Sequence, residues 1–247
     1  MQLTLASLGT LYTALGVVAA MLVPLALLAS SRHRADLALP LGAAGFMAVW
    51  FAVAATLASD GALQTAPGGV PTIVFALGVP IALSVGAVCL IGPVRRAFAL
   101  PEIQPLLIAM QSYRVAGLGF ILLMTLGQIP AIFAIPAGLG DLAIGLTAFG
   151  AASAAQEGRV SRALWWNVLG LLDLAVALTL GVGSGPSRFG FIPTTPRSTF
   201  FAVAPFAVVP SFIVPLDIVL HLLSMRGLLA RHARSVASQP LVQPAAV

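Results

Sequence analysis

The sequence predicts an all-α polytopic membrane protein, a bundle of seven transmembrane helices with its N-terminus outside and its C-terminus cytoplasmic. Of the 247 residues, 60% are hydrophobic and only 8% are charged. The mean hydropathy is +1.06, and the apolar residues fall into runs of about 20, which is the length that crosses a bilayer as a helix. A soluble domain with a solvated surface has a different composition and is excluded.

The first three spans are predicted at residues 3–28, 37–58 and 70–91. The first is too long for a secretory signal and no basic residue precedes it, so it is interpreted as a spanning helix. None of the three contains a charged residue, which favours an apolar scaffold or a lipid-facing layer. A bilayer is therefore the one partner that composition alone predicts.

The last four spans are predicted at residues 105–127, 131–152, 163–181 and 200–225, and all four carry polar side chains. The last span also contains Pro205, Pro210 and Pro215. Proline removes a backbone donor, so this helix is expected to be kinked or partly unwound just before Asp217. Residues 1–225 form the predicted membrane domain, and residues 226–247 a basic, then disordered, cytoplasmic tail.

The orientation rests on the arginines, which supply all twelve basic residues. Nine of them fall in segments on one side of the predicted membrane, and the positive-inside rule makes that side cytoplasmic. These nine are Arg32, Arg34, Arg95, Arg96, Arg159, Arg162, Arg226, Arg231 and Arg234. Arg188 and Arg197 lie on the other side and argue weakly against it. The basic balance is thus explained by orientation, and no nucleic-acid partner is predicted.

A layer of polar side chains is predicted at matching depth on these last four spans. At 1.5 Å per residue, Asp141 and Asp173 lie about 15 Å into their helices, near the midplane, and Arg114 lies at a similar depth. Asp217 is expected closer to the cytoplasm, with His221 one turn later on the same side of the helix. Gln111 and Asn167 are the predicted polar support. Intramembrane polar residues usually face a common interior, so these helices should touch.

The charges in this layer do not balance. An ionised carboxylate at the bilayer centre costs about 2.5 to 3.5 kcal/mol, and three carboxylates against the single guanidinium of Arg114 leave two negative charges. The surplus can be met by protons or by a bound cation. The leading hypothesis is therefore a small proton- or cation-coupled transporter or permease in which Asp141, Asp173, Asp217 and His221 handle the ion.

Two other functions stay open. Asp217 and His221 could ligate a divalent cation in an intramembrane enzyme acting on a lipid. Alternatively, the protein is a non-catalytic assembly subunit whose buried charges fix helix pairing, with water solvating Asp217 and His221. The sequence leaves open a small-ion or small-molecule substrate and a homo-oligomer. It contains no lysine for a retinal Schiff base and no second intramembrane histidine for an axial haem pair.

Spans five and six share the run Gly-Leu-x-Asp-Leu-Ala-x-x-Leu-Thr, at residues 138–147 and 170–179. Consecutive spans run in opposite directions, so the copies would be antiparallel, as in the inverted elements of transporters. Chance is the alternative in a chain this rich in Leu, Ala and Gly.

Spans four to seven carry several short motifs: Gln111-Ser112-Tyr113-Arg114, the segment Pro136 to Asp141, Trp166-Asn167, Asp173, and Pro215-Leu216-Asp217 with His221. Together these motifs resemble a family of uncharacterised bacterial polytopic membrane proteins. The resemblance covers spans four to seven, about half of the chain. It implies a helical bundle in the bacterial cytoplasmic membrane and assigns no catalytic residue.

Overall fold

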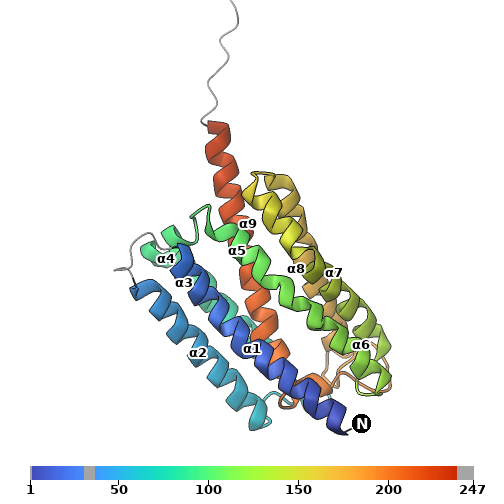
Figure 1. Ribbon diagram of the computed structural model, residues 1–247. Helices are drawn as coiled ribbons and strands as arrows, with labels where there is room; N and C mark the ends of the chain where they lie inside the picture. Colours follow the sequence, from blue (N-terminus) through green and yellow to red (C-terminus); the bar gives the residue numbers. More distant parts are fainter. Residues whose placement is uncertain (1, 31–36, 238–247) are drawn as a thin grey trace, which may run out of the picture.

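The computed structural model describes residues 2–30 and 37–237, and within these ranges it contains helices and no strand. Figure 1 shows the long helices packed side by side into one bundle. In chain order the helices are α1 (Gln2–Ser30), α2 (Ala38–Ser59), α3 (Ile73–Leu90), α4 (Gly92–Ala97), α5 (Ile103–Ala109), η1 (Met110–Gly117), α6 (Leu118–Thr125), α7 (Ala131–Gln156), α8 (Val160–Gly183), η2 (Phe200–Ala202), η3 (Val209–Ile213) and α9 (Val214–Ala237).

Within the residues that the structure describes, seven helical segments are long and apolar enough to cross a membrane, which confirms the predicted all-α bundle of seven spans. The first six begin and end within four residues of the predicted bounds. The seventh differs, because it runs over Val209–Ala233 instead of 200–225. The residues before Val209 are apolar but form a short turn of 3-10 helix and further turns, and hydropathy alone does not separate an apolar turn from a helix.

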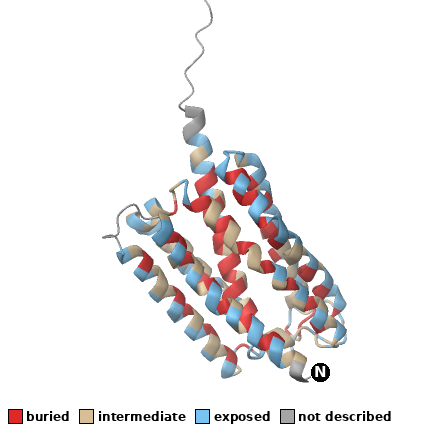
Figure 2. Ribbon diagram, viewed as in Figure 1, coloured by how far each residue is buried: buried red, intermediate tan, exposed pale blue. Residues whose placement is uncertain are grey.

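The seventh span is the centre of the bundle. Of its most apolar window, 67% is buried inside the protein, compared with 11% for α3. α9 packs against α3, α5 and α8, and Figure 2 shows its buried positions running along the middle of the molecule. α1 packs on α2, and α7 packs on α8. Large apolar side chains stay exposed on the outward faces, as expected for contact with lipid.

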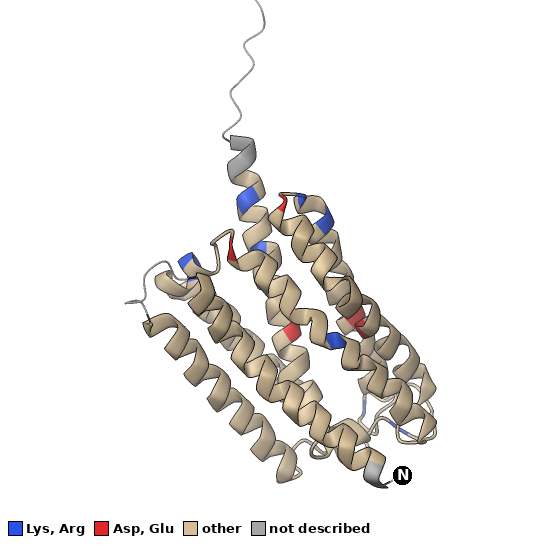
Figure 3. Cartoon of the chain, viewed as in Figure 1, with Lys and Arg blue, Asp and Glu red and all other residues tan. Residues whose placement is uncertain are grey.

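The two ends of the bundle differ in charge. One end, called here the arginine-rich end, carries α4, the turn between α7 and α8, and the C-terminal half of α9 (Figure 1). The opposite end carries the start of α1 and the loops 60–72 and 184–208. Figure 3 shows most basic positions at the arginine-rich end. That this end faces the cytoplasm stays a prediction.

Two of the spans that carry the polar layer are irregular. Span four changes from α-helix to 3-10 helix over Met110–Gly117 and back again, although 3-10 runs longer than three or four residues are uncommon. Span seven begins with a π-helical turn, Val209–Ile213, which contains Pro210 and lies just before Asp217, where the prolines predict irregularity. The indole Nε1 of Trp50 donates to the carbonyl of Ser211 in this turn at 3.0 Å.

The C-terminal segment is helical further than expected. α9 continues through the predicted basic tail to Ala237. The disorder predicted from Ser235 onward falls mostly on residues 238–247, which lie outside the described residues, as do Arg32 and Arg34.

Candidate functional site

Arg114 is the centre of the site, and the 3-10 segment of span four positions it. A 3-10 helix has three residues per turn, so side chains three apart are eclipsed. Gln111, Arg114 and Gly117 therefore form one stripe, and all three are buried. Arg114 is only 3% exposed although it lies in the middle of a membrane span.

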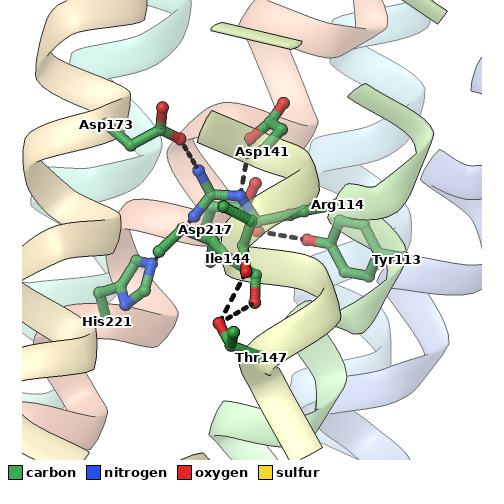
Figure 4. Close-up of polar contacts among 9 residues, drawn as sticks. Tyr113, Arg114, Asp141, Ile144, Thr147, Asp173, Asp217 and His221 are labelled. Atoms are coloured by element: carbon green, nitrogen blue, oxygen red, sulfur yellow. Dashed lines mark hydrogen bonds and ion pairs between the residues drawn. The ribbon is translucent and has the colours of Figure 1, made fainter. Parts of the chain in front are cut away.

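The guanidinium of Arg114 contacts three helices at once (Figure 4). Its Nε donates to Oδ1 of Asp141 on α7 at 2.8 Å. Its Nη2 donates to Oδ2 of Asp173 on α8, and its Nη1 lies 3.0 Å from Nε2 of His221 on α9. The expected meeting of Arg114 with the midplane aspartates is thus present in the structure.

The partners of His221 determine its protonation. Arginine has donors and no acceptor, so Nε2 of His221 accepts from Arg114 and the proton of the neutral ring is on Nδ1. That nitrogen donates to Oδ1 of Asn167 at 3.0 Å. Nδ2 of Asn167 in turn donates to the carbonyl of Ala163 at 2.8 Å and to Oγ of Ser224 at 3.2 Å.

His221 lies inside the bundle. The side chain is 0% exposed, because α9 runs further toward the arginine-rich end than predicted and places this residue inside the bundle. Trp166 is also buried. Its ring packs at 5.2 Å from the His221 ring, and its Nε1 donates to Oγ1 of Thr147 at 2.9 Å. Its neighbour Trp165 is 65% exposed.

Asp217 has a different partner from the other two aspartates. Its Oδ1 accepts a hydrogen bond of 2.6 Å from the hydroxyl of Tyr113, and its side chain is buried. Sequence reasoning missed Tyr113, because adjacent residues of an α-helix point to different faces and Arg114 was already assigned to the site. The available signal was the unbroken polar run from Gln111 to Arg114 within an apolar span.

The geometry gives little support to a metal site at Asp217 and His221. Asp217 is bonded to Tyr113, and the ring nitrogens of His221 face Arg114 and Asn167. Among the described residues, no group of three or more His, Cys, Asp or Glu side chains is arranged to hold a metal ion. A water-activating metal centre needs about three protein ligands that converge on one point. This donor set does not provide them.

Glycines allow the helices to approach closely around the site. A Cβ added to Gly140 would overlap the carboxylate of Asp173, and one added to Gly170 would overlap the imidazole of His221. A Cβ at Gly117 would likewise meet the side chain of Asp141. Small residues at such positions let helix backbones pack tightly in a membrane. The glycines of spans five and six therefore set the distances of the cluster.

Gln111, predicted as polar support, is 0% exposed, and neither its amide nitrogen nor its amide oxygen has a hydrogen-bond partner among the described residues. Asn167, the other supporting residue, is fully bonded as described above. The charge count is unchanged by these contacts. Since His221 is neutral, three carboxylates and one guanidinium leave two negative charges if all three aspartates are ionised.

The comparisons agree with this picture. No curated protein and no solved structure matches the chain. Residues 70–229, which are more than half of the chain, match the family described as a domain of unknown function (DUF8737). The match begins just before α3 and includes every residue of the site, so the resemblance to an uncharacterised membrane family is confirmed. The chain belongs to the DUF8737 family.

Proposed function

We propose that the protein is a small secondary transporter driven by protons, in which Asp141 and Asp173 take up protons and release Arg114 in turn. The observation that carries the proposal is the shared guanidinium: one buried arginine is held by carboxylates from two neighbouring antiparallel helices. An arrangement with one cation and two competing anions can exist in two states. Binding a proton to either carboxylate leaves Arg114 paired with the other.

The surplus of negative charge supports proton binding. Two unbalanced carboxylates inside a membrane bundle are costly unless they are neutralised. The side chains of Asp141 and Asp173 keep 19% and 12% exposure, whereas Asp217 is 2% exposed. The two carboxylates that contact Arg114 are therefore the accessible ones. Asp217 is buried and accepts a hydrogen bond from the uncharged hydroxyl of Tyr113.

Hydrogen-bonded polar groups lead from the cluster toward the arginine-rich end. From Arg114 the hydrogen bonds continue through His221 and Asn167 to Ser224. Ser224 lies one helical turn before Gly227, against which the amide of Gln104 packs. Polar groups thus extend from the midplane toward one face of the membrane, and in the predicted orientation that face is cytoplasmic.

The irregular helical segments of spans four and seven are the parts that change position during transport. The 3-10 segment carries Tyr113 and Arg114, and the π-helical turn of span seven ends four residues before Asp217. Mid-helix 3-10 and π segments often mark hinges and functional sites. The 3-10 segment contacts the carboxylates through Tyr113 and Arg114, and the π-helical turn leads directly into the helix that carries Asp217, so a change in protonation can change their positions.

The test is proton uptake into proteoliposomes under an imposed pH gradient, followed with an entrapped pH-sensitive dye. The native protein is expected to carry protons, and Asp141→Asn and Asp173→Asn each to reduce the rate by at least about tenfold, since a general proton-transfer group typically contributes 10²–10⁴-fold. Glu157→Gln is the matched control, because Glu157 forms an exposed ion pair with Arg159.

Equal rates in all four proteins would contradict the proposal. If no protein carries protons and the two aspartate variants melt at a higher temperature than the native protein, the cluster is a structural pairing device, as in an assembly subunit.

A further inference from the structure

An apolar cavity of about 550 Å³ lies at the opposite end of the bundle, between α3 and α8. Leu77 of α3, Leu178 of α8 and Val214 of α9 contribute to its walls, together with the rings of Phe120 and Phe133. The volume is in the range of sites for small-molecule ligands, which are about 300 to 1,000 Å³ and mostly apolar.

The cavity is covered at the end of the bundle and faces outward at its side. The amide of Gly68 donates to the carbonyl of Pro186, and the amide of Arg188 donates to the carbonyl of Gly69, both at 3.0 Å. These two bonds join the loops 60–72 and 184–208 across the end. α3 and α8 each pack against α9, so α9 forms the back wall. Val74 on α3 lines the cavity and is 47% exposed. A ligand dissolved in the bilayer can therefore enter from the side.

Two exposed arginines stand beside the rim. Arg188 follows the lining residue Ser187, and Arg197 precedes the lining residue Ser198. The Nη1 of Arg197 also donates to the carbonyl of Gly185, another lining residue, at 3.0 Å. These are the two arginines that the positive-inside rule leaves unexplained. Among the described residues at this end of the bundle, Asp60 at the end of α2 is the one acidic residue that lies outside the spans.

The inner part of the cavity approaches the aspartates. Ala177, which lines it, lies one turn after Asp173 on α8, and Val214 lies three residues before Asp217 on α9. The one guanidinium there is already paired with Asp141 and Asp173. An anionic group therefore finds no free cation in the inner part and is attracted to the rim, while an apolar chain suits the walls.

We infer that this cavity binds a single-chain anionic amphiphile, with the alkyl chain inside and the carboxylate or phosphate head beside Arg188 and Arg197. That this ligand is the transported substrate rests on the proposed function. That the cavity binds it does not depend on the proposed function. A substrate of this class would reach the site through the membrane, with its chain ending one turn from the carboxylates that take up the protons.

Binding is measured by scintillation proximity, with tritiated palmitate and the purified full chain in a non-ionic detergent, without any gradient. Saturable binding is expected. Unlabelled palmitate should displace the label and hexadecyltrimethylammonium should not. Displacement by lysophosphatidate as well assigns the site to any single anionic head, and displacement by palmitate alone assigns it to a carboxylate.

Two single phenylalanine variants and one double arginine variant locate the ligand. Ala177→Phe fills the cavity and should weaken binding by at least about tenfold. The control Ala175→Phe adds the same ring to an exposed position of the same helix outside the cavity lining and should bind like the native protein. The double variant Arg188→Gln with Arg197→Gln should weaken palmitate about tenfold and leave displacement by neutral hexadecanol unchanged.

The inference is overturned if binding is not saturable, if the two phenylalanine variants behave alike, or if the cationic amphiphile competes as well as palmitate. Asp141→Asn and Asp173→Asn should retain palmitate binding. Loss of binding with intact proton uptake would remove this inference alone, and intact binding without proton uptake would remove the proposed function alone.

Discussion

The two halves of the bundle are stabilised in the membrane by different interactions. α1, α2 and α3 carry no charged residue along their spans, whereas the spans from α5 to α9 carry the three carboxylates and the guanidinium of the site (Figure 3). They also carry the buried imidazole of His221. The first half is held by apolar packing, such as Trp50 and Phe51 of α2 against Phe212 of span seven. The second half is held by hydrogen bonds to Arg114, whose removal leaves charges behind.

Substitutions should therefore change the stability of the two halves by unequal amounts. Apolar packing between helices competes with equally apolar lipid. A buried ion pair, by contrast, is costly to break because the remaining partner stays charged or unbonded. The stability of the second half should depend on a few side chains, and that of the first on none in particular.

The largest effect is expected for Arg114→Gln. This change leaves three carboxylates without a cation, and breaking a buried pair costs about 3 to 5 kcal/mol. Thermal unfolding in detergent, followed by loss of the monodisperse chromatographic peak, measures it. Arg159→Gln is the control, since its ion pair with Glu157 is about half exposed, and such pairs contribute about 0 to 1 kcal/mol. Equal melting temperatures would break the comparison.

Gly140→Ala should have the next largest effect. Its methyl group would overlap the carboxylate of Asp173, and overpacking of this kind costs about 1 to 3 kcal/mol. Gly150→Ala on the same helix meets open space, and it should be neutral or stabilise by up to about 1 kcal/mol. The two variants are compared by thermal unfolding. A destabilised Gly150 variant would indicate that glycine flexibility matters along all of α7.

Asn167→Leu tests how much the hydrogen bond between His221 and Asn167 stabilises the second half. The leucine removes the acceptor of the Nδ1 proton of His221, and an unbonded buried donor costs about 1 to 3 kcal/mol. Asn167→Gln keeps an uncharged amide acceptor and should recover part of the loss. The measurement is again thermal unfolding, and ¹⁵N NMR of labelled histidine reports the tautomer. A ring protonated on Nε2 would contradict the assigned contacts.

The smallest effect is expected in α3. Gly86→Ala adds a methyl group where nothing lies within 4 Å, so the change should alter stability by no more than about 1 kcal/mol, in the stabilising direction. It should leave proton uptake unchanged. A large loss of either would show that α3 is more than a scaffold.

The sequence predicts much of the fold because each span is an apolar run of bilayer length, and this signal does not depend on packing. The start of span seven is the exception, since the apolar residues 200–208 continue the hydropathy signal although the chain turns there. The 3-10 segment at Arg114 is also unpredicted. No proline lies within it, and it packs closely against α7, where a Cβ built on Gly145 would lie 2.6 Å from the amide nitrogen of Val115.

For the site, depth counting brings Arg114, Asp141 and Asp173 to one level, because it needs only residue number and rise per residue. It fails for partners that depend on the face of the helix and on the true register. Tyr113 reaches Asp217 from an irregular segment, and His221 is buried because α9 is shifted relative to the prediction.

We propose that protons balance the surplus of negative charge around Arg114. Infrared difference spectroscopy across a pH titration detects protonated carboxylic acids through their C=O stretch, in the native protein and in Asp141→Asn, Asp173→Asn and Glu157→Gln. We expect a protonated carboxyl band near neutral pH that loses intensity in the two aspartate variants and not in the Glu157 control. Fully ionised carboxylates in the native protein, with an unchanged spectrum in both aspartate variants, would contradict it.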